Sequence, residues 1–322
     1  MSMDNKQQGR IPATFLGVPA AGQQALSGAD IVIFGAAEAT PHLPGQASHA
    51  ARAPSALRDS TRSIASDPLR WDFDQDGPLL SPELRVVDLG DLATSPATPL
   101  ENRAAITATT VSIVKAGAVP VLLGGDDSVP IPFFAAFQPC GPVTILQIDA
   151  HLDWRDERGG LKHTFSSTMR RASEMPWVER IIQVGQRGVG GSRAGDLADA
   201  RAWGVHLFDA ASVRRHGVQP IVEQVVPGSR CIVTLDCDGL DPGVIPAVLV
   251  PQPGGLGYLD VVELLHGVAG RARIVGFDLV ELVPDADVRG LGVLAASRIF
   301  CVALGCIGRQ QLASRERRPA AG

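Results

Sequence analysis

Acidic and imidazole side chains follow two of the most apolar stretches of this sequence. Asp149, His151 and Asp153 end the run "VTILQIDAHLDW", which is typical of a buried strand. Strand side chains two positions apart point to the same side, so these three groups are expected to converge. Asp236 and Asp238 repeat the pattern in "RCIVTLDCDG". Burying such groups without partners costs several kcal/mol, so the pattern predicts a partner.

The partner that these residues predict is a pair of divalent metal ions. Several carboxylates and an imidazole in one cleft would repel one another and take up protons unless cations were present. Oxygen-rich ligand sets with an imidazole suit Mn²⁺ or Ni²⁺, with Co²⁺ and Zn²⁺ as alternatives. Two ions about 3.5–4 Å apart, bridged by carboxylates and a hydroxide, would neutralise the charge and supply a nucleophile.

Each acid taken alone has a simpler interpretation. Asp127, which precedes Ser128, and Asp153 would each be a helix cap or a loop acid, and Asp241 in "GLDPG" would be a turn residue. The glycines of "GVGGSRAG" lack the spacing and the Lys-Ser/Thr pair of a phosphate-binding loop. The two acid-bearing strand ends, considered together, favour the metal site.

Eight apolar, β-branched runs alternate with amphipathic or Ala-rich stretches, which predicts a parallel sheet covered by helices on both faces. The expected strands begin near residues 30, 84, 118, 142, 180, 205, 230 and 272. Ligands of such sheets bind at the carboxyl ends of the strands, and four of these ends carry acids, at Asp126 and Asp127, at 149–153, at 236–238 and at Glu281. We expect one α/β domain over residues 26–312, after an N-terminal arm (1–25) and before a C-terminal tail (313–322).

The composition is typical of a soluble globular protein. Hydrophobic residues make up 45% of the 322 residues, charged residues 20%, and the net charge is −5. No basic cluster indicates nucleic-acid binding, and no apolar segment near the N-terminus indicates a secretory signal. Residues 291–308 are expected to form a core helix rather than a membrane span. The five cysteines are odd in number and lack CxxC spacing, which indicates reduced thiols in a cytoplasmic protein.

Three motifs stand out along the chain: "GGDDS", "DAHLD" and "TLDCDGLDPGVIPAVLVPQPGG", supported by "GQASHAARAPSALR", "VDLGD" and "GFDLVELVP". Together they resemble the ureohydrolase family of arginases, agmatinases and related amidinohydrolases, with the agmatinase-like branch fitting best. The likeness spans roughly residues 30–308 in the expected order. It implies an arginase-like, three-layer α/β/α fold with a mainly parallel sheet of about eight strands.

The resemblance also implies roles for the clustered residues. Asp149 and Asp236 would bridge two ions, with Asp153 on one ion and His151 and Asp238 on the other. A metal-bridging hydroxide would attack the guanidinium carbon and release urea and an amine. Glu281 would accept hydrogen bonds from the planar guanidinium cation, which orients it and balances its charge. Protonation of the leaving amine requires a general acid.

Two positions depart from the family pattern. Asp127 replaces a metal-binding His; its carboxylate can still be a ligand, but it is shorter and adds a negative charge. In the loop "LKHTFSSTMRRASEM", Phe165 occupies the position where the family carries a proton-shuttling His. His163, two residues earlier, is the candidate replacement, and an exposed loop histidine is the alternative.

The leading hypothesis is an active amidinohydrolase whose guanidino substrate is not arginine. Its substrate would be agmatine-like, a guanidino acid, a small guanidine or a biguanide, with its tail contacted by Trp154, Arg155, Phe165 and Arg170. The alternative is a degenerate, metal-poor subunit that supports an active homologue; Asp127 favours it, whereas the intact ligands and Glu281 weigh against it. A phosphatase-like two-metal hydrolase would explain the acids but not the three ordered motifs.

The expected partner is a small guanidino substrate, with no nucleic acid and no membrane. The resemblance implies a homo-oligomer, a trimer or a hexamer, with a hetero-oligomer as the alternative.

Overall fold

The computed structural model describes residues 13–22, 26–190 and 192–317. Its centre is an eight-stranded sheet in the order β4-β1-β5-β10-β9-β6-β7-β8, and every strand pair in it is parallel. The strands are β1 (Ile31–Ala36), β4 (Val86–Asp91), β5 (Val119–Gly124), β6 (Val143–Ile148), β7 (Val178–Val184), β8 (His206–Phe208), β9 (Arg230–Asp236) and β10 (Arg273–Val280). The eight expected strands and the expected fold class are confirmed.

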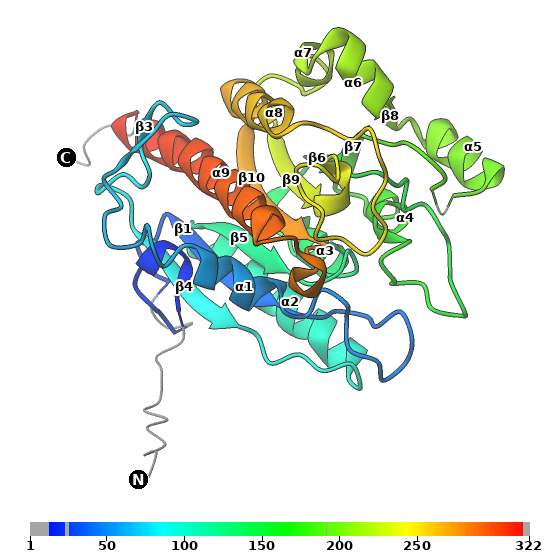
Figure 1. Cartoon of the computed structure of the whole chain (residues 1–322), viewed down its shortest axis with the longest axis horizontal. Coiled ribbons are helices and arrows are strands. Elements are labelled where there is room, and N and C mark those ends of the chain that lie inside the picture. The colour runs from blue at the N-terminus through cyan, green and yellow to red at the C-terminus, as the bar shows by residue number, and fades with distance from the viewer. Residues whose placement is uncertain (1–12, 23–25, 191, 318–322) are drawn as a thin grey trace.

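Helices cover both faces of the sheet because successive strand residues point in opposite directions. In β1, Ile31 and Ile33 pack toward one face and Val32 and Phe34 toward the other, in two separate hydrophobic clusters. The first cluster contains side chains of α1 (Ala53–Ser60), α6 (Ala210–His216), α7 (Gln219–Val222), α8 (Tyr258–Arg271) and α9 (Leu291–Glu316). The second contains side chains of α2 (Pro99–Lys115), α3 (Pro130–Ala135), α4 (Thr168–Ser173) and α5 (Ala194–Trp203). These are the three layers seen in Figure 1.

The remaining elements are short. A hairpin of β2 (Trp71–Asp72) and β3 (Gly77–Pro78) forms a separate antiparallel sheet. In the described part of the chain, the larger elements are connected by the 3₁₀ turns η1 (Phe15–Gly17), η3 (Gln138–Cys140), η4 (Cys237–Gly239) and η5 (Pro284–Ala286). All five cysteines are free thiols.

The long C-terminal helix α9 is a core helix. It is long and apolar enough to cross a membrane by length and composition, but 67% of its most apolar window is buried within the protein. Phe300 of α9 packs on Phe15 of η1, with ring centroids 4.6 Å apart. The division into arm, domain and tail stays a prediction, and residues 1–12, 23–25 and 318–322 lie outside the described part of the chain.

Candidate metal centre and active site

The four acid-bearing strand ends meet at one edge of the sheet. The strands β5, β10, β9 and β6 are consecutive neighbours in the sheet order. Since all of them run in parallel, the residues that follow them emerge on the same side. The sheet therefore brings together acids that are more than a hundred residues apart in the chain, such as Asp127 and Asp236.

Two groups of potential metal ligands form at this edge, and they share Asp149. One group is Asp127, Asp149 and Asp236; the other is Asp149, His151 and Asp238. Within each group the ligand atoms all lie within 4.8 Å of one another. A carboxylate common to two ligand groups is the arrangement that two neighbouring ions require.

The side chains converge as expected, but tight turns bring them together rather than strand alternation. β6 ends at Ile148, before the first of these residues, and Asp149 Oδ1 accepts a hydrogen bond from the His151 backbone N–H at 2.5 Å. Asp236 Oδ1 accepts one from the Asp238 N–H at 2.8 Å in the same way. Asp153 has a left-handed backbone, with φ of 46°, which is uncommon for a residue with a side chain. Such strain is characteristic of functional sites.

A pair of buried glutamines, missed in the sequence, holds two of the acids. Gln147 Nε2 donates to Asp149 Oδ2 at 2.6 Å and to Asp153 Oδ2 at 3.2 Å. Gln183 Nε2 in turn donates to Gln147 Oε1 at 2.5 Å, which fixes the orientation of that amide. The signal in the sequence was a polar residue inside each of two buried strands. Partners of this kind orient metal ligands and tune their affinity.

The acids are buried so completely that they cannot all be ionised without cations. Burial, followed by the charges of neighbouring carboxylates, raises the pKa of Asp127, Asp149 and Asp236 well above the usual range. Burial alone would lower the pKa of His151, but hydrogen bonding to Asp238 and its charge outweigh that effect and raise it to about 9. Both carboxylate oxygens of Asp127 are buried without a hydrogen-bond partner among the described residues. This donor set fits divalent ions.

Glu281 lies at the end of β10, beside the ligand groups. It too has a left-handed backbone, with φ of 62°. Its Oε1 accepts a hydrogen bond from the Asp127 N–H at 2.9 Å, and its Oε2 lies 2.5 Å from His49 Nε2. Sequence reasoning did not single out His49, although it belongs to one of the supporting motifs.

Phe165 is brought to this region, whereas His163 is not. The Phe165 ring stacks on His42, with centroids 4.4 Å apart, and meets His49 edge-on at 5.7 Å. The guanidinium carbon of Arg158 lies 5.9 Å from the centre of the same ring. His163 instead lines a separate cavity of about 660 Å³, with residues of α2, α3 and α4.

The other expected substrate contacts are distributed differently. Trp154 is a core residue, 2% exposed, that packs edge-on against Trp203 at 6.4 Å. Arg170 forms ion pairs with Glu174 and Asp199 near the surface. Arg155 lies in the loop after Trp154, where its backbone N–H donates to the Ser166 carbonyl at 3.0 Å. The side chains of Trp154 and Arg170 thus point elsewhere, although the Arg170 backbone N–H donates to the Asp153 carbonyl at 3.1 Å.

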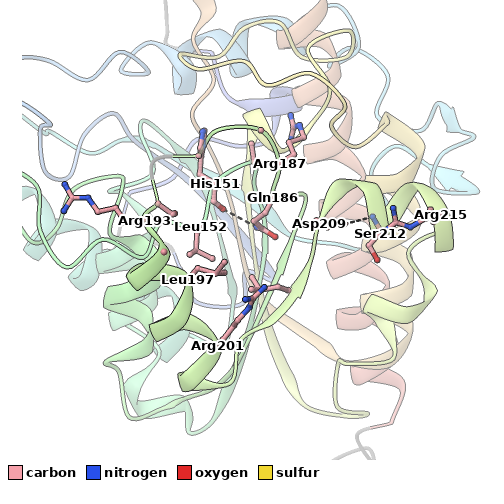
Figure 2. Close-up of a pocket in the computed structure, with 16 residues that line it drawn as sticks. His151, Leu152, Gln186, Arg187, Arg193, Leu197, Arg201, Asp209, Ser212 and Arg215 are labelled. Carbon is pink, nitrogen blue, oxygen red and sulfur yellow. Dashed lines mark hydrogen bonds between the residues drawn. The ribbon is translucent and has the colours of Figure 1, made fainter.

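A cavity of about 560 Å³ lies beside His151, between α5 and α6. Figure 2 shows Arg193 and Arg215 on opposite sides of it, with Arg201 between them. The guanidinium of Arg187, at the edge of the cavity, already donates hydrogen bonds to backbone carbonyls, including that of Asp238 at 2.7 Å. The cavity therefore has a cationic lining next to one of the potential metal ligands.

Comparison with known proteins agrees with the architecture and with the motifs. The model of the arginase family matches residues 29–305. A guanidinobutyrase of Pseudomonas aeruginosa is 31% identical over 236 residues, which cover 70% of this chain and 73% of the relative. An agmatinase of Pyrococcus horikoshii is 27% identical over 279 residues, which cover 85% of this chain and 91% of the relative.

Solved structures give the same result. A hypothetical agmatinase from Burkholderia thailandensis superposes with a TM-score of 0.78 at 27% identity, covering 96% of this chain and 93% of the other. A proclavaminate amidinohydrolase from Streptomyces clavuligerus gives a TM-score of 0.78 at 26% identity, with coverage of 93% and 98%. The chain therefore belongs to the arginase family and, within it, to the agmatinase-like branch of ureohydrolases, which hydrolyse carbon–nitrogen bonds of guanidino compounds.

Proposed function

We propose that this chain hydrolyses a guanidino compound other than arginine to urea and an amine, with two divalent metal ions, Mn²⁺ or Ni²⁺, as cofactors. The observation that carries this proposal is the pair of ligand groups sharing Asp149 beside the carboxylate of Glu281. When bound, the two ions would supply a hydroxide nucleophile near neutral pH.

Most of the clustered residues would bind the metal ions, and Glu281 would bind the substrate. Asp127 and Asp236 would hold one ion, His151 and Asp238 the other, and Asp149 both. The bridging role that the resemblance gives to Asp236 stays a prediction, since Asp236 belongs to one of the two groups. Asp153, which shares the Gln147 Nε2 donor with Asp149, would join the ligands of one ion. The Glu281 carboxylate, fixed by the Asp127 N–H, would accept hydrogen bonds from the guanidinium and present its carbon at a constant angle.

The substrate class that this proposal favours is a guanidino acid. Arg158 lies over the Phe165 ring, which contacts the Glu281 partner His49, and the cavity beside His151 carries further arginines. A carboxylate tail on either side would meet cations. Among the relatives, the guanidinobutyrase, a guanidinopropionase of the same organism and a human guanidino acid hydrolase are named for such compounds. An agmatine-like amine, a small guanidine and a biguanide are the comparison compounds.

The test is elemental analysis of the purified protein, followed by a urea-release screen over these compounds with Mn²⁺, Ni²⁺ and Co²⁺. We expect two ions per chain and turnover, fastest with a guanidino acid. Absence of bound metal and of urea with every compound would contradict the proposal. Urea release that starts only after an intact homologue is added would establish the degenerate-subunit alternative, which the unusual Asp127 favours.

Replacement of Asp127 by His should increase metal affinity by about tenfold and shift preference toward Ni²⁺ or Zn²⁺. An imidazole removes one negative charge from the buried acids and is the ligand that these ions prefer. Equilibrium dialysis against each metal measures the change, with Asp241→Asn as a control because Asp241 caps a turn through backbone N–H groups. Unchanged affinity and metal preference in Asp127→His would remove Asp127 from the ligand set.

Assembly into a homotrimer or homohexamer, the hetero-oligomer alternative and a cytoplasmic location stay predictions.

A further inference from the structure

The reaction proposed above needs a proton for the leaving amine, and the histidines of the chain can be sorted by their positions. The chain has seven, and the structure describes all of them. His151 belongs to a ligand group. Four others lie elsewhere: His163 in the α2–α3–α4 cavity, His206 beside Arg180, His216 at the end of α6, and His266 against the Asp74 carbonyl. His42 and His49 remain.

Of these two, His49 contacts the residue that would hold the guanidinium. Its Nε2 lies 2.5 Å from Glu281 Oε2, and its side chain is 19% exposed. Glu281 Oε1 accepts the Asp127 N–H and Oε2 faces His49, so a guanidinium held by Oε2 would lie next to His49 Nε2. A carboxylate oxygen has lone pairs for two donors, so both contacts can exist at once.

The surroundings hold the His49 ring in place and favour its protonated form. Phe165 meets the ring edge-on, and His42 stacks on Phe165. The charged or titratable groups that face His49 are Glu281, Asp126 and His42, with Arg158 across the Phe165 ring. Burial by itself would lower the pKa of His49, but the hydrogen bond and charge of Glu281 raise it above its usual value.

We propose that His49 supplies the proton for the leaving amine, acting through Glu281 Oε2, and this inference rests on the proposed function. As the bond between the guanidinium carbon and the leaving nitrogen breaks, that nitrogen takes the bonding electron pair. The carbon–oxygen bond becomes the carbonyl of urea, and its hydroxyl proton is released to water. It also takes the proton that His49 Nε2 shares with Glu281. His49 is left neutral and regains a proton from water through its partly exposed face.

The test compares His49→Ala and His49→Gln with the parent enzyme and with His216→Ala as a matched control. His49→Ala should lower kcat by about 10²–10⁴-fold, the usual contribution of a positioned acid, with KM changed less than about threefold. His49→Gln keeps a hydrogen-bond donor for Glu281 but carries no transferable proton, so it should be equally slow. If His49 had only a structural role, His49→Gln should keep a kcat close to that of the parent.

Two further readouts separate proton transfer from positioning. In the parent enzyme kcat should fall as pH rises through the raised pKa of His49, and this alkaline limb should vanish in His49→Ala. Added imidazole should restore part of the lost rate in His49→Ala, while metal content stays at the parent level. A kcat within twofold of the parent, or a larger loss in His163→Ala, would overturn the inference.

Failure of the proposed function would be distinguishable. If the parent enzyme releases no urea with any compound, that proposal fails, whereas the His49–Glu281 pair can still be tested in the metal-free protein. NMR titration of the His49 ring should show that its pKa falls in Glu281→Gln. An unchanged His49 pKa in that variant would overturn the pairing itself.

Discussion

Asp149→Asn is expected to lower ion binding at both positions and to reduce urea release by more than about 1,000-fold, which corresponds to about 4 kcal/mol. Asp149 is the one residue present in both ligand groups, so its loss affects both ions, whereas loss of His151 or Asp238 affects one group. An amide is a weaker ligand than a carboxylate and carries no charge to balance two cations. Elemental analysis and urea-release kinetics measure the two effects.

The same substitution should stabilise the metal-free protein, by about 1–3 kcal/mol at pH 8. Asp149 is 0% exposed, and burial and then neighbouring carboxylates raise its pKa well above the usual range. A carboxyl whose pKa is raised by folding binds more protons in the folded state, so the parent protein loses stability as pH rises above the unfolded-state pKa of about 4. The advantage of Asp149→Asn should therefore be absent near pH 4 and grow toward pH 8.

Urea unfolding in the presence of a chelator measures this difference. Asp241→Asn is the control of opposite sign, because the backbone N–H groups of Gly243 and Gly254 hold the pKa of that exposed carboxyl below its usual value. Relative to the parent, Asp241→Asn should become less stable as pH rises above the Asp241 pKa, because only the parent gains an ionised, hydrogen-bonded carboxylate. The prediction is wrong if metal-free Asp149→Asn is less stable than the parent at pH 8. That result would show that charge repulsion among the buried acids does not destabilise the metal-free protein.

The parts of the site that the sequence could predict depend on short-range patterns and on one rule of topology. Apolar runs located all eight strands of the main sheet, and acids at their ends located Asp149, His151, Asp236 and Asp238. Parallel strands expose their carboxyl ends at one edge, so these acids had to meet wherever their strands were neighbours. Neither step needs knowledge of a particular tertiary contact.

The remaining parts depend on contacts between distant segments that leave no local pattern. His49 and Glu281 are 232 positions apart and approach only because β1 and β10 both neighbour β5. His163 and Phe165 lie in the loop between β6 and α4, which the structure describes throughout and which contains no helix or strand. Tertiary packing therefore sets the relative placement of the loop side chains. The structure places the two candidates of this loop apart, with Phe165 against His49 and His163 in another cavity.

Arg58→Met is expected to lower the free energy of unfolding by about 3–5 kcal/mol, the usual effect of removing one partner from a buried ion pair. The Arg58 side chain is only 4% exposed. Its Nε donates to Asp88 Oδ2 at 2.8 Å and its Nη2 to Asp88 Oδ1 at 3.0 Å. Arg58 also forms an ion pair with Asp91. Without Arg58, the Asp88 carboxylate would remain buried, and its donors among the described residues would be the backbone N–H groups of Phe15 and Gly90. Urea unfolding of the metal-loaded protein measures the loss.

Arg62→Met is the matched control for this stability effect. Arg62 lies just beyond α1 and pairs with Asp59 at 2.7 Å, but both side chains are largely exposed, so its loss should change stability by less than about 1 kcal/mol. Equal effects of the two substitutions would show that the buried pair contributes no more than a surface pair. Arg58 joins α1 to β4 through its ion pairs with Asp88 and Asp91, and His49 lies in the loop just before α1. Loss of Arg58 should therefore also weaken the His49–Glu281 contact. In that variant we expect kcat to fall while the metal content of the folded protein stays at the parent level.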